Sequence, residues 1–181
     1  PASSVLSHMR TALADASGKP VSLLGPNLVP GSAQSWSSAD LRELADQRGR
    51  AVQGGSQAAL RILYLHGDLE GDRSVLGVAV RGDVFAVFSD VIAESTSPLV
   101  SSGEIFDAVS MHELGHLLGL VDLVLSTGRQ DPVHPGHSPN RGSVMFLAVE
   151  SDLISQVLGG SPPNEFDADD RADLATIRAS N

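Results

Sequence analysis

The chain has 181 residues, of which 41% are apolar, and this length suits one compact domain with a substantial core. The 12 Lys and Arg against 22 Asp and Glu give a formal net charge of -10, which argues against nucleic acid and anionic membranes as partners. The sequence has no cysteine, which excludes disulfides, thiolate metal sites and cysteine nucleophiles. No apolar stretch approaches the roughly 20 residues of a membrane span, so we expect no membrane insertion of this chain.

The first half of the chain is predicted to alternate helices with strands. We expect a short helix over residues 5–16, a short strand over 21–24 and a surface helix from about residue 38 to 52. Three further strands are expected at 60–65, 75–80 and 84–88. The last two flank Arg81-Gly82-Asp83, a connection compatible with a tight hairpin.

The second half is predicted to contain one long helix, an irregular region and a final helix. Ser101 and Glu104 fit a capping box that starts a helix running to about Leu118. Residues 124–143 are rich in Gly, Pro, Ser, Asp and His and are expected to form a long structured loop, and residues 167–179 a closing helix. These elements predict an α+β fold with a mixed sheet covered by two helices, in one domain over residues 1–181.

The long helix carries a pattern typical of metal sites. His112 and His116 lie one turn apart and only about 40° apart around the helix, so their imidazoles can share a metal ion. Glu113 lies at the margin of the same face, from which it could reach a metal-bound water without being a ligand. The rest of the helix is apolar almost all round, so it should be buried. Two core histidines that are merely satisfied by hydrogen bonds explain this buried group poorly. We therefore predict one catalytic Zn²⁺ on this helix.

A catalytic zinc site requires a third protein ligand, and the sequence offers several. Gly119 can adopt a left-handed conformation, so the chain could turn there and bring Asp122 back to the metal. We prefer Asp122 as the third ligand. His134 or His137 could take that place instead, and the remaining candidates are His8, His66 and the downstream acids.

The spacing His112-Glu113-x-x-His116-x-x-Gly119-x-x-Asp122 resembles the zinc signature of the metzincin clan of metallopeptidases. The aspartate at the last position is similar to snapalysin-like and matrixin-like bacterial proteases. Residues 142–146 resemble the Met-turn of that clan, with Met145 as the methionine beneath the zinc.

The resemblance implies a function and a fold. It implies a secreted or cell-envelope zinc endopeptidase with Glu113 as general base and a protein or peptide as substrate. It also implies a mixed twisted sheet with an antiparallel edge strand, two long helices and an irregular C-terminal lobe (about 120–181) after an N-terminal lobe (about 1–119). Peptides would bind along the edge strand, for which we propose Val75, Leu76, Gly77, Val78, Ala79 and Val80.

The sequence departs from this resemblance at two places. Phe146 stands where some metzincins have a tyrosine that binds zinc or donates to the transition state, so no tyrosine switch is expected. His134 and His137 lie in the loop before Met145, where they could hold a second metal, replace Asp122, contact the substrate, or simply be surface residues.

Two other functions stay open from the sequence. A zinc hydrolase of gluzincin type would use a downstream glutamate such as Glu150 as its third ligand. A noncatalytic binding domain would use four protein ligands around a structural zinc ion. The acidic segments 68–72 and 167–173 match no recognisable calcium loop, so calcium is unsupported. The start at Pro1 favours a processed product, and we expect a monomer.

Overall fold

The computed structural model describes residues 3–27, 32–47, 59–151, 154 and 159–180, and these residues form an α+β fold. Its main sheet has three strands in the order β2 (Arg61–Leu65), β5 (Val84–Phe88) and β4 (Gly77–Arg81). β2 runs parallel to β5, and β4 runs antiparallel to it, with a register shift between Ala79 and Arg81. The sheet is therefore mixed, and β4 is its antiparallel edge strand, as predicted.

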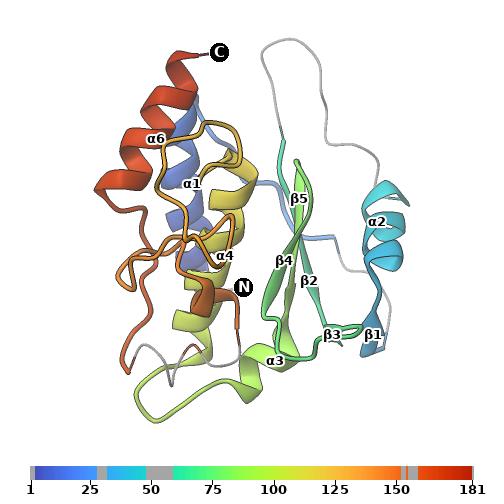
Figure 1. The fold of residues 1–181 in the computed structure, drawn as a ribbon. Coiled ribbons are helices and arrows are strands. Elements are labelled where there is room, and N and C mark those ends of the chain that lie inside the picture. The colour runs from blue at the N-terminus through green and yellow to red at the C-terminus, as the bar shows by residue number, and fades with distance from the viewer. Residues whose placement is uncertain (1–2, 28–31, 48–58, 152–153, 155–158, 181) are drawn as a thin grey trace.

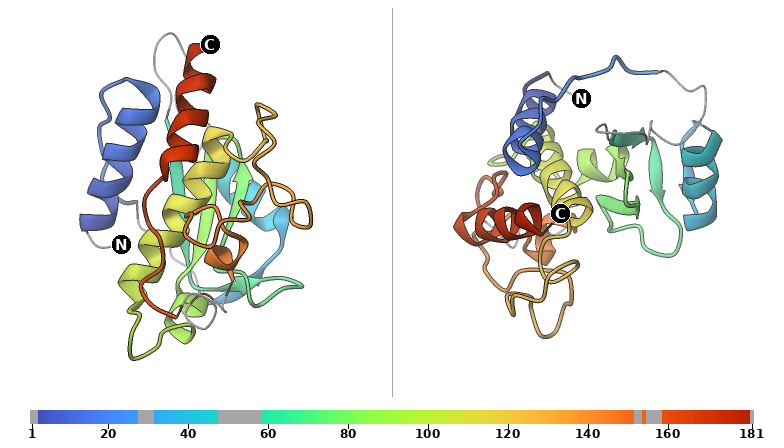
Figure 2. Two further views of the ribbon diagram at one scale, coloured as in Figure 1. Left: turned by 60° about the vertical axis from the view of Figure 1, so that its left-hand side comes forward. Right: turned by 90° about the horizontal axis from the view of Figure 1, so that it is seen from above.

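Helices cover both faces of this sheet. Three long helices lie on one side, and a shorter helix lies on the other (Figures 1 and 2). Those on the first side are α1 (Ser3–Ser17), α4 (Ser102–Leu118) and α6 (Ala168–Ala179), and the one on the second is α2 (Ser38–Gln47). A single hydrophobic core joins residues of α1, the sheet, α4 and the C-terminal part of the chain. None of the helices among the described residues is long and apolar enough to cross a membrane.

α4 is the central helix, and its ends are determined by local sequence. Ser101 and Glu104 form the predicted reciprocal capping box. Hydrogen bonds to the Glu104 carboxylate, above all from the Ser161 hydroxyl, lower the pKa of Glu104 to about 2. At the other end Gly119 has φ 85°, a left-handed conformation that ends the helix as expected for glycine. The body of the helix is buried and contacts β4 and β5.

Several smaller elements differ from the sequence prediction. The strand expected at 21–24 is wrong: these residues form no regular structure and are largely exposed, because no neighbouring strand pairs with them. Helix α2 is described as far as Gln47. The sequence predicts that it extends to residue 52, but residues 48–52 lie outside the described part of the chain. The elements that were not predicted are the parallel pair β1 (Gln34–Trp36) and β3 (Gly67–Leu69), helix α3 (Ser89–Glu94) and the 3-10 helix η1 (Leu147–Glu150).

Candidate metal centre

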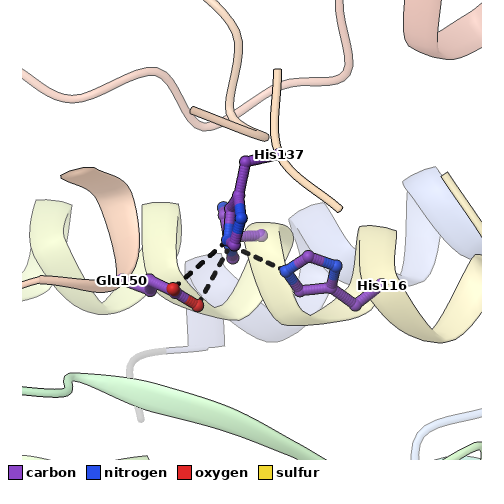
Figure 3. A group of neighbouring side chains, drawn as sticks. His116, His137 and Glu150 are labelled. Atoms are coloured by element: carbon purple, nitrogen blue, oxygen red, sulfur yellow. Dashed lines mark hydrogen bonds and ion pairs between the residues drawn. The ribbon is translucent and has the colours of Figure 1, made fainter. Parts of the chain in front are cut away.

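Four side chains from three segments converge beside α4 and could hold a metal ion. His112 and His116 come from α4, His137 from the loop that follows the helix, and Glu150 from the end of η1. One ligand atom of each lies within 4.8 Å of the corresponding atoms of all the others. Figure 3 shows His137 reaching down from its loop towards Glu150 and His116. Segments that are distant in sequence therefore supply a compact set of three imidazoles and one carboxylate.

His112 is held in one orientation by the backbone. Its side chain is fully buried, and Nδ1 lies 2.7 Å from the carbonyl oxygen of Val144. Because a carbonyl can only accept, Nδ1 carries the proton and donates it, which leaves the lone pair on Nε2. Nε2 is also the atom that lies 3.0 Å from Nε2 of His116. A hydrogen bond from the second ring nitrogen to a carbonyl is the usual way in which proteins orient a metal-binding histidine.

His116 is in the neutral form that a metal ligand requires. Its burial, together with the proximity of His112 and His137, lowers the pKa of His116 to about 3. The imidazole is therefore uncharged near neutral pH and offers a lone pair for binding. The backbone of α4 determines where it lies, one turn after His112.

The loop that carries His137 is held in place by its backbone. The amide of His137 donates to the His134 carbonyl at 3.1 Å, and its own carbonyl accepts from the Asp131 amide at 2.6 Å. The next amide, of Ser138, donates to the Met145 carbonyl at 2.8 Å. These bonds position the His137 ring, which is stacked on the ring of His112 with centroids 5.3 Å apart.

Glu150 closes the group. Its Oε1 lies 3.2 Å from Nε2 of His137, and its Oε2 lies 3.5 Å from Nε2 of His112. The contact with His137 does not have hydrogen-bond geometry, so neither ring nitrogen of His137 has a hydrogen-bond partner. Burial would raise the pKa of Glu150, but its interactions with the two histidines outweigh burial and keep that pKa well below its usual range.

These separations are compatible with a shared metal ion. Two ligands of a tetrahedral zinc ion, each about 2.0–2.1 Å from it, lie about 3.3 Å apart. Three of the contacts within the group measure 3.0, 3.2 and 3.5 Å, and all of its ligand atoms lie within 4.8 Å of one another. The orphaned ring nitrogens of His137 are a further sign, since buried polar atoms normally have partners. The group therefore suits a divalent ion that accepts nitrogen and oxygen ligands.

Glu113 lies at the same site without belonging to the group. Its side chain is fully buried, and neither carboxylate oxygen has a hydrogen-bond partner of good geometry. Burial, and secondly the charge of Glu150, raise the pKa of Glu113 well above its usual value, and the nearby amide of Ala79 offsets this only in part. Gly77 on β4 makes room for it, because a Cβ there would lie 3.0 Å from Oε1 of Glu113.

A pocket of about 370 Å³ opens beside these residues. It is bordered by the predicted base, by two members of the metal group, by the edge strand and by two leucines. The lining residues are Val78, Ala79, Arg81, Gly82, Glu113, His116, Leu117, Leu123 and Glu150. The edge strand and the candidate metal group thus face one space.

The prediction that Asp122 joins the two helix histidines needs correction. Its Oδ1 accepts hydrogen bonds from the amide and hydroxyl of Thr127 at 2.6 and 2.9 Å and from the Gly128 amide at 3.1 Å. The chain does turn after Gly119, but Val121 and Asp122 also take left-handed conformations, with φ of 55° and 63°. The aspartate side chain therefore caps the following loop, a role typical of this residue. His137 lies with the helix histidines in its place.

The other candidates are found as follows. His134 lies outside the group, is 46% exposed in its side chain and contacts Asp131. His8 contacts Asp107 of α4 and His66 contacts Asp90, and neither histidine belongs to the group. The described residues contain no second group of three or more potential ligands, in the acidic segments or elsewhere.

Met145 is fully buried beneath the helix. It lies in a turn that is closed by a hydrogen bond of 3.1 Å from the Phe146 amide to the Ser143 carbonyl. Its sulfur contacts the backbone of α4 at Gly115, where a Cβ would collide with it. The Val144 carbonyl of the same turn is the one that orients His112. The turn therefore supports the helix at the level of the two histidines.

The proposed edge strand is mostly placed as expected. Gly77 to Val80 belong to β4, while Val75 forms an isolated bridge with Ser151 and the Leu76 amide donates to the Glu150 carbonyl at 2.8 Å. The first two residues of the range thus connect to the segment that carries Glu150.

The sequence suggests Glu150 by name only as the third ligand of the alternative, gluzincin-type zinc hydrolase. One signal in the sequence points to it: a single carboxylate ends the apolar run from Val144 to Val149. An acidic residue at the end of a buried segment requires a partner, and here the partners are histidines.

The chain was also compared with known proteins. No protein-family model, curated protein or solved structure matches it.

Proposed function

We propose that this protein is a zinc-dependent endopeptidase in which Glu113 acts as the general base. One observation carries the proposal: the Glu113 carboxylate is buried without a hydrogen-bond partner and borders the same pocket as His116 and Glu150. An unpaired buried carboxylate costs several kcal/mol, and a nearby cation offsets that cost. A fold retains such a group where its chemistry is needed.

The residues of the pocket have separate roles. A zinc ion held by histidines and a carboxylate lowers the pKa of water towards about 7 and polarises a carbonyl group. Glu113 accepts a proton from water in the pocket and returns it to the leaving amine. The raised pKa of Glu113 makes its carboxylate a stronger proton acceptor than an ordinary glutamate.

The edge strand supports a peptide as substrate. Among the described residues, β4 pairs with a strand only on the β5 side, and its residues Val78, Ala79 and Arg81 line the pocket. An extended peptide could pair with the free edge of β4 while its side chains meet Leu117 and Leu123. The motif and the buried methionine, which resemble metzincins, agree with this assignment. Secretion and a monomeric state stay predictions.

The test compares wild-type protein with Glu113→Gln. We expect about one zinc per chain in both, by elemental analysis, and a loss of casein hydrolysis of about 10²–10⁴-fold in the variant. The exposed Glu94, at the end of α3, provides the control Glu94→Gln, which should keep full activity. Equal activity in Glu113→Gln, or a wild-type protein that retains no metal, would refute the proposal.

The second candidate is a noncatalytic domain stabilised by zinc. The observation in its favour is the fourth member of the group, because structural zinc sites use four protein ligands. This function predicts retained metal, no hydrolysis by any variant, and an effect of Glu113→Gln on stability alone.

A further inference from the structure

We propose that Glu150 is a displaceable fourth ligand, which closes the metal site while the pocket is empty and leaves it when another ligand enters. The inference rests on the proposed function, since it describes how that same site is opened. The problem it addresses is one of coordination. A catalytic zinc ion keeps one position for water or substrate, whereas four protein ligands fill a tetrahedral site. One of the four groups must therefore be exchangeable if the site is catalytic.

The surroundings of the four residues single out Glu150. His112 is fully buried and is fixed through Nδ1 by the Val144 carbonyl. His116 is held on the rigid body of α4, and the side chain of His137 is 13% exposed beneath a loop that is bonded to Met145 through Ser138. The side chain of Glu150 is 26% exposed and lines the pocket. Glu150 is the only carboxylate in the group of four, and its side chain is more exposed than that of either histidine it contacts, His112 or His137.

Glu150 can move its side chain while its backbone stays in place. The Glu150 carbonyl accepts from the Leu76 amide at 2.8 Å, and the next residue, Ser151, bridges to Val75. The carboxylate lies at the end of a chain of single bonds, so a rotamer change removes it from the group without breaking these bonds. The displacement therefore requires no change of fold.

The position of Glu150 connects displacement to substrate. Its anchor, Leu76, directly precedes β4, the strand whose free edge borders the pocket. A peptide that pairs with β4 arrives beside the Glu150 carboxylate, where its scissile carbonyl competes for the same position.

The test uses the full chain loaded with Co²⁺, whose visible absorption changes with its ligands, and azide as a probe. Three proteins are titrated with azide: wild type, Glu150→Gln and Glu150→Ala. We expect each Glu150 variant to retain about one cobalt per chain and to bind azide at least about tenfold more tightly than wild type. Glutamine keeps the size of the side chain but removes the carboxylate. The Gln variant therefore distinguishes the loss of a metal ligand from the space that alanine would open. His137→Ala is the matched control and should lose cobalt.

Two outcomes would overturn the proposal. Loss of cobalt in both Glu150 variants would make Glu150 an indispensable ligand, and equal azide affinity in all three proteins would show that it does not occupy the fourth position. Neither readout depends on catalysis. If the metal measurements behave as expected but no protein hydrolyses casein, the peptidase function fails while the role of Glu150 stands.

Discussion

At the scale of single residues, the site depends on which polar groups have found local partners. The carboxylate of Asp122 accepts hydrogen bonds from the amides of Thr127 and Gly128, which lie within six residues of it in the chain. These local bonds occupy the carboxylate in place of a metal. His137 differs, because both of its ring nitrogens are buried and neither has a hydrogen-bond partner, although Nε2 lies 3.2 Å from Oε1 of Glu150. Local hydrogen bonds thus hold Asp122 in its loop, while the rule that buried polar atoms are satisfied favours a metal ion at His137.

This contrast gives a prediction for metal affinity. His137→Ala should weaken zinc binding by at least about 100-fold, because it removes a direct contact with the ion. Asp122→Ala should leave zinc affinity unchanged and destabilise only the loop. Competition with a chromophoric chelator measures both affinities. The reverse ranking would restore Asp122 as the third ligand.

Asp170 predicts a pH dependence of stability. Burial is the main cause that raises the pKa of Asp170 from 3.8 to about 6, and its contact with the Asp167 amide offsets this only partly. A carboxyl whose pKa is raised on folding stabilises the fold fully below its unfolded pKa, and that contribution is lost as pH rises through the folded pKa. Between pH 4 and pH 7 the loss amounts to about 2 kcal/mol.

Asp170→Asn should remove this loss. Urea unfolding at a series of pH values should show the stability of the variant rising relative to that of the wild type from pH 4 to pH 7, with most of the change between pH 4 and pH 6. The exposed Asp169, the preceding residue in the same helix, provides the control Asp169→Asn. A constant difference between Asp170→Asn and wild type at all pH values would contradict the prediction.

At the scale of elements, α4 and the turn around Met145 form one unit. Gly115 allows the Met145 sulfur to approach the helix backbone, and the next residue, His116, belongs to the metal group. The same turn orients His112 through the Val144 carbonyl. Helix and turn must therefore keep their relative positions for the two imidazoles to converge.

Gly115→Ala tests this unit. Alanine is normally the better helix former by about 1 kcal/mol, but here the added methyl group collides with Met145 and should destabilise the fold by about 1–3 kcal/mol. Gly103, in the first turn of α4, is the matched control, since a Cβ there meets only the Ser101 hydroxyl at 3.9 Å. Gly103→Ala should be neutral or stabilising in thermal unfolding. Equal effects of the two substitutions would contradict the close packing.

At the scale of the whole molecule, the metal group brings together side chains from three segments that are distant in sequence. α4, the loop at His137 and η1 all contribute side chains to this group, and α4 and η1 also meet in the core. An ion bound there should therefore stabilise the folded chain by mass action, because the unfolded chain does not hold the four groups together.

Metal removal should accordingly lower the melting temperature. At a free zinc concentration about 100 times the Kd, binding contributes about 2.7 kcal/mol, or about 5–10 °C for a chain of this length. Differential scanning calorimetry with and without EDTA measures the shift. Glu113→Gln should retain it and His116→Ala should not. An unchanged melting temperature in wild type would contradict a bound metal.

Much of the fold could be predicted from the sequence because its signals are local. The caps at Ser101 and Asp167, the glycine at 119 and the alternation around Arg81-Gly82-Asp83 act within a few residues, and each gave the correct element. The pair of β1 and β3 could not be predicted in this way. Each of these strands has three residues, and their pairing joins positions about 33 residues apart.

The site divides along the same line. The sequence by itself determined that His112, Glu113 and His116 share one helical surface, because helix geometry alone relates residues one turn apart. Only the tertiary structure decided the rest of the metal group. A ligand that comes from a loop depends on long-range packing and on the competing hydrogen bonds of each candidate, and these brought His137 and Glu150 to α4 while they held Asp122 at Thr127.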